Sequence, residues 1–317
     1  MKTIDSQMID FDRYLKQPEE GANVKPASDW SQDVIDRLYS DEPGVHGLTL
    51  PWNNTRANFR IRPGEVTLWP GTNGHGKSVV LGQIILGQLE QGESACIASM
   101  EMSPVATMER ICRQAAGCSN PPIKYIRGLH KWTDGKLWLY DQHGTVKHDR
   151  ILAVMRYCSE ELKITQFVID SLMKCGIDDD DHNGNKRFID QICAHAKDTG
   201  MHVHLIAHSR KGRDELSAPG KMDVRGTGAI TDQVDNVITV WRNKQKELDI
   251  EAGRSIDPFN PDTLLICDKQ RHYAWEGKIC LWFDKQSFQF TESPKDRPQM
   301  MNIGDEHFTN EPEYVQF

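Results

Sequence analysis

A glycine-rich stretch in the first third of the chain carries the residues best suited to chemistry. Gly71 is followed by four residues and then by Gly76, Lys77 and Ser78, which matches the phosphate-binding pattern G-x4-G-K-[ST]. Glycines let backbone N–H groups approach phosphate oxygens, and the start of a following helix adds partial positive charge. We expect Lys77 to contact the β- and γ-phosphates of a nucleotide and Ser78 to ligate Mg²⁺. The full set of residues that we expect to touch the nucleotide here is Gly71, Thr72, Asn73, Gly74, His75, Gly76, Lys77, Ser78 and Val79.

The surrounding sequence predicts the elements that must position this loop. Residues 65–69 form a short apolar run before it, and residues 78–88 carry a helical pattern after it. Apolar runs and helical patterns then alternate, which indicates an α/β fold whose mostly parallel sheet is covered on both faces. The expected parallel strands lie within residues 65–69, 94–101, 137–142, 165–172, 202–209 and 227–243, and a closing antiparallel set lies within residues 262–271, 277–284 and 287–291.

Three polar residues follow predicted strands at their carboxyl ends, the edge at which open α/β sheets bind ligands. Glu101 ends the run SME and could orient and deprotonate an attacking water. Asp170 follows the apolar run FVI and could hold Mg²⁺ together with the loop serine. His208 ends LIAH and could sense the γ-phosphate. Taken alone, each of the three could instead be an ordinary strand-end or structural side chain.

Residues 209–226 form a long polar stretch that is basic and rich in glycine. Long loops in compact domains are usually functional, and we interpret this one as a nucleic-acid loop whose backbone-directed contacts would weaken with salt. A solvated surface loop is the alternative. The cations that we assign to single-stranded DNA are Arg210, Lys211, Arg213, Lys221 and Arg225.

Two further cations, Lys269 and Arg271, lie two residues apart on a predicted strand and so on one face of it. Such a pair suits neutralisation of γ-phosphate charge. Arginine fingers are often delivered by a neighbouring subunit, so this role would require an oligomer.

The two ends of the chain differ from the centre. Apolar residues at helical spacing, from Trp30 to Leu38, predict one amphipathic helix within residues 29–40. The sequence leaves open whether this helix packs on its own domain or on a neighbouring subunit. Residues 1–28 are polar, and the run PEEGANVKPAS at 18–28 suggests a flexible linker. The stretch from Ser293 is acidic and proline-containing and suggests a disordered tail. We therefore divide the chain into an extension (1–43), a core domain (44–290) and a tail (291–317).

The amino-acid composition argues against several classes of protein. The chain has 317 residues, of which 38% are hydrophobic and 26% charged, with a net charge of −8. That charge argues against a broad basic face for nucleic acid, so any DNA contact must be local. Apolar runs of about 18 residues and a signal-like N-terminus are both missing, which predicts a cytoplasmic protein. Eight cysteines without a C-x-x-C pair suggest reduced core thiols.

Taken together, six segments in order resemble the RecA-like motor of DnaB-type replicative helicases, with the branch of Twinkle and the phage primase-helicases the most similar. These segments are RPGEVTLWPGTNGHGKS, CIASMEMS, FVIDS, LIAHSRK, VRGTGAITDQVDNVITVWRN and CDKQRHYAWEGKICLWF, and they cover roughly residues 44–290. The resemblance implies a P-loop NTPase that forms a hexameric ring and moves 5′ to 3′ on single-stranded DNA. It implies ATP or another NTP and Mg²⁺ as cofactors.

The resemblance also implies roles for matching positions. Glu101 would be the catalytic base, Asp170 the metal-linked carboxylate and His208 the γ-phosphate sensor, with the phosphate-loop roles as above. Lys269 and Arg271 match the trans-acting cations, and the loop 209–226 matches the DNA loop. Arg242 and Phe283 match positions that flank the base. The helix within 29–40 matches the linker helix, which favours docking on a neighbour.

The chain departs from the family in one respect. Many relatives carry a primase, toprim or zinc domain before the motor, whereas about 45 residues precede it here, so we expect no primase activity from this chain. The terminal stretch EPEYVQF suggests a hypothesis in which Phe317 and nearby acids bind a polymerase or a separate primase; a solubilising tail is the alternative. Two other functions on the same fold remain, a RecA- or RadA-like recombinase and a KaiC-like regulator that hydrolyses ATP without DNA.

Overall fold

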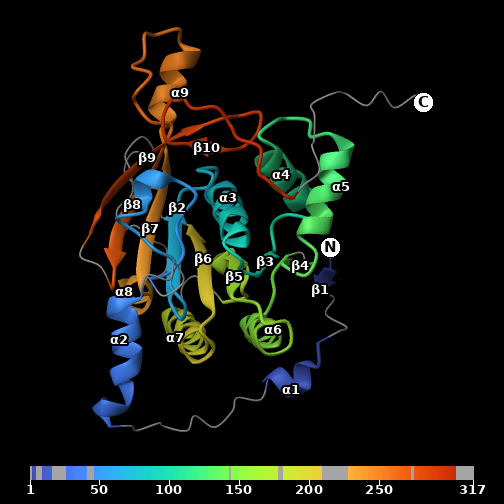
Figure 1. The fold of residues 1–317 in the computed structure, drawn as a ribbon, viewed down its shortest axis with the longest axis vertical. Coiled ribbons are helices and arrows are strands. Elements are labelled where there is room, and N and C mark those ends of the chain that lie inside the picture. Colours follow the sequence, from blue (N-terminus) through green and yellow to red (C-terminus); the bar gives the residue numbers. More distant parts are fainter. Residues whose placement is uncertain are drawn as a thin grey trace.

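The computed structural model of this chain describes residues 2–4, 9–15, 26–40, 46–142, 144–177, 181–208, 228–272 and 275–304. Within this part a ten-stranded sheet runs through the molecule (Figure 1). Its strands, in their spatial order, are β1 (Lys2–Ile4), β4 (Leu137–Tyr140), β3 (Ala95–Ser99), β5 (Gln166–Asp170), β6 (His202–His208), β2 (Val66–Gly71), β7 (Asn236–Arg242), β8 (Thr263–Gln270), β9 (Gly277–Phe283) and β10 (Phe290–Thr291). The first seven in this order pair in parallel, and β8, β9 and β10 pair antiparallel. The predicted parallel sheet and its antiparallel extension are therefore confirmed.

Helices cover both faces of this sheet because its central strands are apolar on both sides. All six residues of β2 are buried. Leu68 packs in one core cluster with side chains of α6 and α7, whereas its neighbour Trp69 packs in a second cluster with α3, α4 and α5 (Figure 1). The helices are α1 (Phe11–Leu15), α2 (Ser31–Tyr39), α3 (Lys77–Glu90), α4 (Pro104–Ala116), α5 (Ile123–Trp132), α6 (His148–Glu160), α7 (His182–Thr199), α8 (Gly228–Gln233) and α9 (Lys244–Glu251).

Local sequence signals set the ends of α4. The Ser103 hydroxyl accepts a hydrogen bond from the Ala106 N–H at 3.2 Å, and Pro104 occupies the first turn. Gly117 ends the helix in the left-handed region, with φ of 66°. This capping fixes α4 beside the phosphate loop.

Strand register brings the carboxyl ends of four strands to one edge. Gly71 at the end of β2 lies opposite His208 at the end of β6. Ser99 at the end of β3 lies opposite Asp170 at the end of β5. Glu101 follows Ser99 by two residues. The residues singled out on three different strands therefore meet at one edge, as parallel pairing requires.

The N-terminal stretch is more ordered than its polar sequence predicts. β1 pairs in parallel with β4, and α1 packs on α6 with the Tyr14 hydroxyl 2.9 Å from Glu161 Oε1. The flexible linker predicted for residues 18–28 falls mostly outside the described residues, so β1 and α1 leave that prediction untested. Three- and five-residue elements are too short to show a periodic pattern, so tertiary contacts alone mark them.

The predicted disordered tail also needs correction, because residues 293–304 pack on the domain. The Met301 N–H donates to the Ala115 carbonyl at 2.7 Å, and the Tyr125 hydroxyl donates to the Met301 carbonyl at 3.1 Å. Met301 and Ile303 pack against the core cluster that contains α4 and α5. Two apolar side chains in a polar stretch suffice to dock it. The hypothesis about Phe317 falls outside the described residues.

The predicted amphipathic helix is α2, and its apolar residues are largely exposed, although Val34 and Leu38 line an open cleft shared with the core domain. Val34 and Leu38 are 52% and 67% exposed, and Trp30, Ile35 and Tyr39 are also exposed. Contact with its own domain therefore leaves most of this apolar surface in water. Within the ranges described above, we find no helix with the length and apolar character that a bilayer crossing demands.

Candidate functional site

The phosphate loop joins β2 to α3 in the conformation that its glycines permit. Gly74 and Gly76 adopt φ of 79° and 83°, in the left-handed region that other residues avoid. Gly71 packs so closely on β7 that an added Cβ would lie 2.4 Å from the Val240 carbonyl oxygen. The first N–H groups of α3 have no partner within the helix and point out of its start. The loop thus presents backbone donors suited to an anion.

Lys77 places a buried ammonium group inside this loop. Its side chain is 6% exposed, and Nζ donates to the carbonyls of Gly71 at 2.9 Å and Thr72 at 3.1 Å. Burial lowers the pKa of Lys77 to about 8, against the opposing effect of Asp170 and Glu101. An anion bound in the loop would stabilise the charged form. The group is therefore fitted to a phosphate ligand.

Asp170 and Ser78 meet across the gap between β5 and α3. The Ser78 hydroxyl donates a hydrogen bond to the Asp170 carboxylate, which is 5% exposed. Burial raises the pKa of Asp170, Glu101 raises it further, and Ser78, Lys77 and Arg110 oppose the rise. A hydroxyl and a carboxylate oxygen are ligands that Mg²⁺ prefers, so the pair fits that ion. Among the residues that the structure describes, no group of three His, Cys, Asp or Glu side chains forms a further metal site.

Glu101 and His208 are joined through a serine that the sequence did not single out. The Ser171 hydroxyl donates to Glu101 Oε1 at 2.9 Å and lies 3.3 Å from His208 Nε2. His208 Nε2 is 3.5 Å from Glu101 Oε1, and its Nδ1 is 3.3 Å from Lys77 Nζ. The structure thus brings Glu101, His208, Lys77, Ser78 and Asp170 into one network. Ser171 directly follows Asp170 in the motif FVIDS, which is the signal that could have identified it.

Arg110 on α4 is the second residue that sequence reasoning missed. Burial lowers the pKa of Arg110, and the nearby Asp170 carboxylate opposes this. Its position seven residues after Ser103, inside a helical pattern, gave no local sign of a site. The open cleft that contains Arg110 is lined by Asn73, Gly74, Gly76, Lys77, Ser78, Val79, Met100, Glu101, Met102, Arg110, Asp170, Met173, Lys174 and His208. The cleft therefore holds lysine, arginine and histidine side chains beside two carboxylates.

Known proteins show similarity to this chain, although family models do not. No protein-family model matches the chain. Among curated proteins it is similar to a DNA helicase/primase of Enterobacteria phage T3, with 23% identity over 239 residues, covering 69% of this chain and 41% of that protein. The chain thus spans less than half the length of this relative.

Two solved structures share its architecture. The first, an ATPase domain, has a TM-score of 0.67 and 15% identity, covering 85% of this chain and 99% of that one. The second, a DnaB-like replicative helicase whose structure was solved to show its interactions with primase, has a TM-score of 0.65 and 15% identity, covering 85% and 67%. This chain has the fold of a DnaB-type helicase motor domain. The predicted RecA-like fold class and the resemblance to DnaB-type helicases are confirmed.

The two residues predicted to flank the base lie on the phosphate-loop side of the sheet. Arg242 ends β7; its N–H lies 3.3 Å from His75 Nδ1, and its Nη1 donates to the Gly74 carbonyl at 3.2 Å. Phe283 ends β9, and its ring centroid is 4.9 Å from that of Phe290. Their role at a base remains a prediction.

The structure does not bring the remaining predicted site residues to this cleft. Because β8 is antiparallel to β7, Lys269 and Arg271 lie at the opposite edge of the sheet from Gly71. The two edges are separated by the length of β2, roughly 16 Å at about 3.3 Å per residue. Neither cation therefore reaches the phosphate loop of its own chain. The assigned DNA-binding residues Arg210, Lys211, Arg213, Lys221 and Arg225 fall outside the described residues.

Proposed function

We propose that this chain is the motor of a replicative DNA helicase that hydrolyses ATP or another NTP and moves on single-stranded DNA. One observation carries the proposal. The network of Lys77, Ser78, Asp170, Glu101 and His208 lies at one edge of the sheet, and the cations that would complete it lie at the other. Such a site requires a neighbouring subunit, as a ring provides. The similarity to a phage helicase/primase supports the same function.

The side chains have distinct tasks in this proposal. Lys77 and the loop N–H groups bind phosphate oxygens, and Ser78 with Asp170 would hold Mg²⁺, which neutralises phosphate charge when bound. Glu101 accepts the proton of the attacking water. Ser171 holds the Glu101 carboxylate in position at 2.9 Å, and His208 lies between Glu101 and Lys77, where it can report on the γ-phosphate. Arg110 adds positive charge on the same side as Asp170.

Arg271 of one subunit acts, in this proposal, on the nucleotide of the next. Arginine fingers contribute about 10³- to 10⁵-fold to hydrolysis.

We further propose that the ring is a hexamer moving 5′ to 3′, that α2 docks on the neighbouring motor, and that a separate primase or a polymerase binds the tail. The family resemblance and the exposed apolar face of α2 support these points.

Hydrolysis in the presence and absence of single-stranded DNA tests the function. We expect strong stimulation by DNA in about 50 mM salt and a large loss of stimulation in about 300 mM salt. The Glu101→Gln chain should bind nucleotide normally and hydrolyse it about 10²- to 10⁴-fold more slowly. Hydrolysis that is indifferent to DNA would favour a regulatory ATPase instead, and filaments in electron micrographs would favour a recombinase.

A mixing experiment tests action between subunits. Arg271→Ala should bind nucleotide but lose about 10³-fold in hydrolysis. Glu101→Gln and Arg271→Ala chains should regain activity when mixed, because some interfaces then pair an intact Glu101 with an intact Arg271. Mixtures that stay inactive would count against a shared site.

A further inference from the structure

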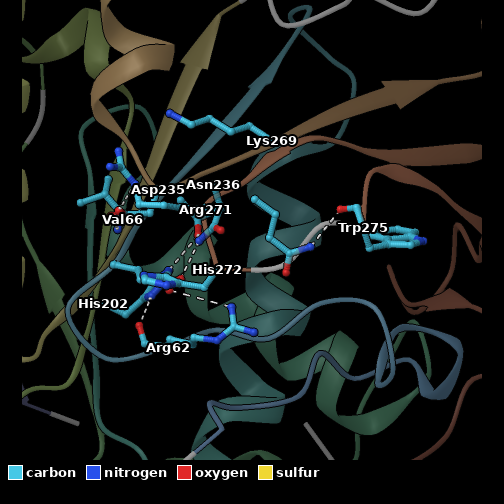
Figure 2. Close-up of polar contacts among 12 residues, drawn as sticks. Arg62, Val66, His202, Asp235, Asn236, Lys269, Arg271, His272 and Trp275 are labelled. Atoms are coloured by element: carbon cyan, nitrogen blue, oxygen red, sulfur yellow. Dashed lines mark hydrogen bonds and ion pairs between the residues drawn. The ribbon is translucent and has the colours of Figure 1, made fainter. Parts of the chain in front are cut away.

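The edge of the sheet opposite the phosphate loop carries a buried carboxylate that binds Arg271 (Figure 2). Asp235 lies between α8 and β7 and is 3% exposed. Its Oδ1 is 2.9 Å from Arg271 Nε, and the Arg271 N–H donates to the Asp235 carbonyl at 3.0 Å. Main chain and side chain of Arg271 are therefore both fixed to one residue.

Asp235 is in turn fixed to β2, the strand that leads to the phosphate loop. Its Oδ2 accepts a hydrogen bond from the Val66 N–H at 2.9 Å, and its own N–H donates to the Val66 carbonyl at 3.0 Å (Figure 2). The two carboxylate oxygens thus have separate tasks, one on β2 and one on Arg271. A buried carboxylate that loses its partner is costly, so this arrangement holds the arginine firmly.

The other polar groups nearby are engaged elsewhere. The Glu65 carboxylate accepts from Asn236 Nδ2 at 2.8 Å and lies 3.9 Å from Arg62 and 3.4 Å from His272. His202 is fully buried, which lowers its pKa to about 4 and keeps it neutral. Asp235 is therefore the carboxylate that this buried cluster directs at Arg271.

Arg271 remains accessible despite these contacts. Its Nη2 donates to the carbonyls of Gln233 at 3.2 Å and Val234 at 3.4 Å, at the end of α8. These bonds and the ion pair use Nε and Nη2, and the side chain is 44% exposed. Lys269 differs, because its Nζ is bound by three carbonyls of residues 231, 232 and 234 at 2.8 to 2.9 Å. Of the two cations, Arg271 is the one held by a carboxylate and presented to solvent.

We propose that Asp235 is a positioning residue that orients Arg271 toward the nucleotide of the neighbouring subunit. The inference rests on the proposed function, because it assumes that Arg271 acts between subunits. It adds that the direction of the guanidinium is set by a residue bound to β2. Asp235 does not touch the nucleotide; it acts through Arg271.

A double-mutant cycle on DNA-stimulated hydrolysis by the full chain tests this role. Asp235→Asn removes the charge and keeps the size. We expect it to lower kcat about 10- to 100-fold, the order expected for a misplaced catalytic group, with the nucleotide KM changed less than about twofold. In the Arg271→Ala background the same change should have no further effect on kcat. Asp249→Asn, which breaks a 2.7 Å ion pair with Arg254 on the surface, is the matched control and should leave kcat unchanged.

Complementation separates positioning from a structural role. Asp235→Asn chains mixed with Glu101→Gln chains should recover hydrolysis, because the defect of the first lies in the neighbour's site. If Asp235→Asn fails to assemble, Asp235→Glu takes its place, since it keeps the charge and displaces the guanidinium, and the same loss and recovery are expected.

The outcomes distinguish the inference from the function on which it rests. A normal kcat for Asp235→Asn, together with a large loss for Arg271→Ala, overturns the inference and leaves the function in place. If Asp235→Asn lowers kcat equally in the wild-type and Arg271→Ala backgrounds, or if mixing with Glu101→Gln chains restores no hydrolysis, Asp235 has a purely structural role. Either result also overturns the inference. A normal kcat for Arg271→Ala removes the shared site and the inference together.

Discussion

Replacing Lys77 by methionine should stabilise the nucleotide-free chain while abolishing nucleotide binding. Burial lowers the pKa of Lys77 from 10.5 to about 8. One pKa unit corresponds to about 1.36 kcal/mol, so at pH 7 the folded chain loses roughly 3 kcal/mol by holding this ammonium charged in a buried place. Methionine has a similar length and removes that penalty. The substitution also removes the bonds to the Gly71 and Thr72 carbonyls, each worth about 1 kcal/mol.

The net gain at pH 7 is therefore about 1 to 2 kcal/mol, or roughly 1.5–3 °C in Tm for a chain of this size. The direction in which wild-type stability changes with pH follows from the lowered pKa of Lys77 in the folded state. Between about pH 8 and 10.5 the unfolded chain binds the proton that the folded chain has lost, so wild-type stability rises with pH in that window. The extra free energy of unfolding of Lys77→Met over the wild type should thus be largest below pH 8. It should decrease by about 2 kcal/mol by about pH 9.5.

Chemical unfolding of both chains at about pH 7 and about pH 9.5, without nucleotide, measures this difference. Lys285→Met, at an exposed lysine, is the matched control and should change stability little at either pH. Added nucleotide should raise the Tm of the wild type and not of Lys77→Met. A variant that is less stable than wild type at pH 7, or a difference that does not change with pH, would refute the reasoning that burial penalises this charge.

Two further predictions concern the phosphate loop and α2. Gly71→Ala should lower stability by about 1–3 kcal/mol and raise the nucleotide KM, because the added methyl meets the Val240 carbonyl; Gly135→Ala, which faces open space, should leave KM unchanged in the same hydrolysis assay. Leu38→Asp should reduce assembly, seen by light scattering, without lowering the Tm of the isolated chain, because Leu38 is 67% exposed there. An unchanged KM for Gly71→Ala, or assembly untouched by Leu38→Asp, would contradict these two assignments.

The parts of this fold that the sequence predicts are those fixed by local rules. The phosphate loop needs glycines at set positions, and the central strands need continuous apolar runs, so both can be read from short stretches. The clustering of Glu101, Asp170 and His208 was also predictable, because each ends a parallel strand and such ends meet at one edge.

The parts that escaped prediction depend on packing between distant segments. Arg110 enters the site only through the approach of α4 to the cleft, and Asp235 gains its partner only through the register of β7 on β8. Ser171, in contrast, directly follows Asp170 and was missed although its motif is local. Helices α5 and α9 were missed as separate elements, and β1 is too short for any pattern. The antiparallel direction of β8 was predicted, and it places Lys269 and Arg271 at the far edge, so this position could have been inferred from the sequence.

The placement of the phosphate loop and Arg271 at opposite ends of β2 restricts the symmetry of any assembly that uses both. A twofold dimer could join the two ends only if both lay on one self-complementary surface, and assembly would then stop at two complete sites. A head-to-tail contact instead produces closed rings or open helical arrays. An open array always leaves one phosphate loop without a partner arginine, whereas a closed ring leaves none. Ring closure alone would therefore add one working site, and a ring opened to admit DNA would lose one.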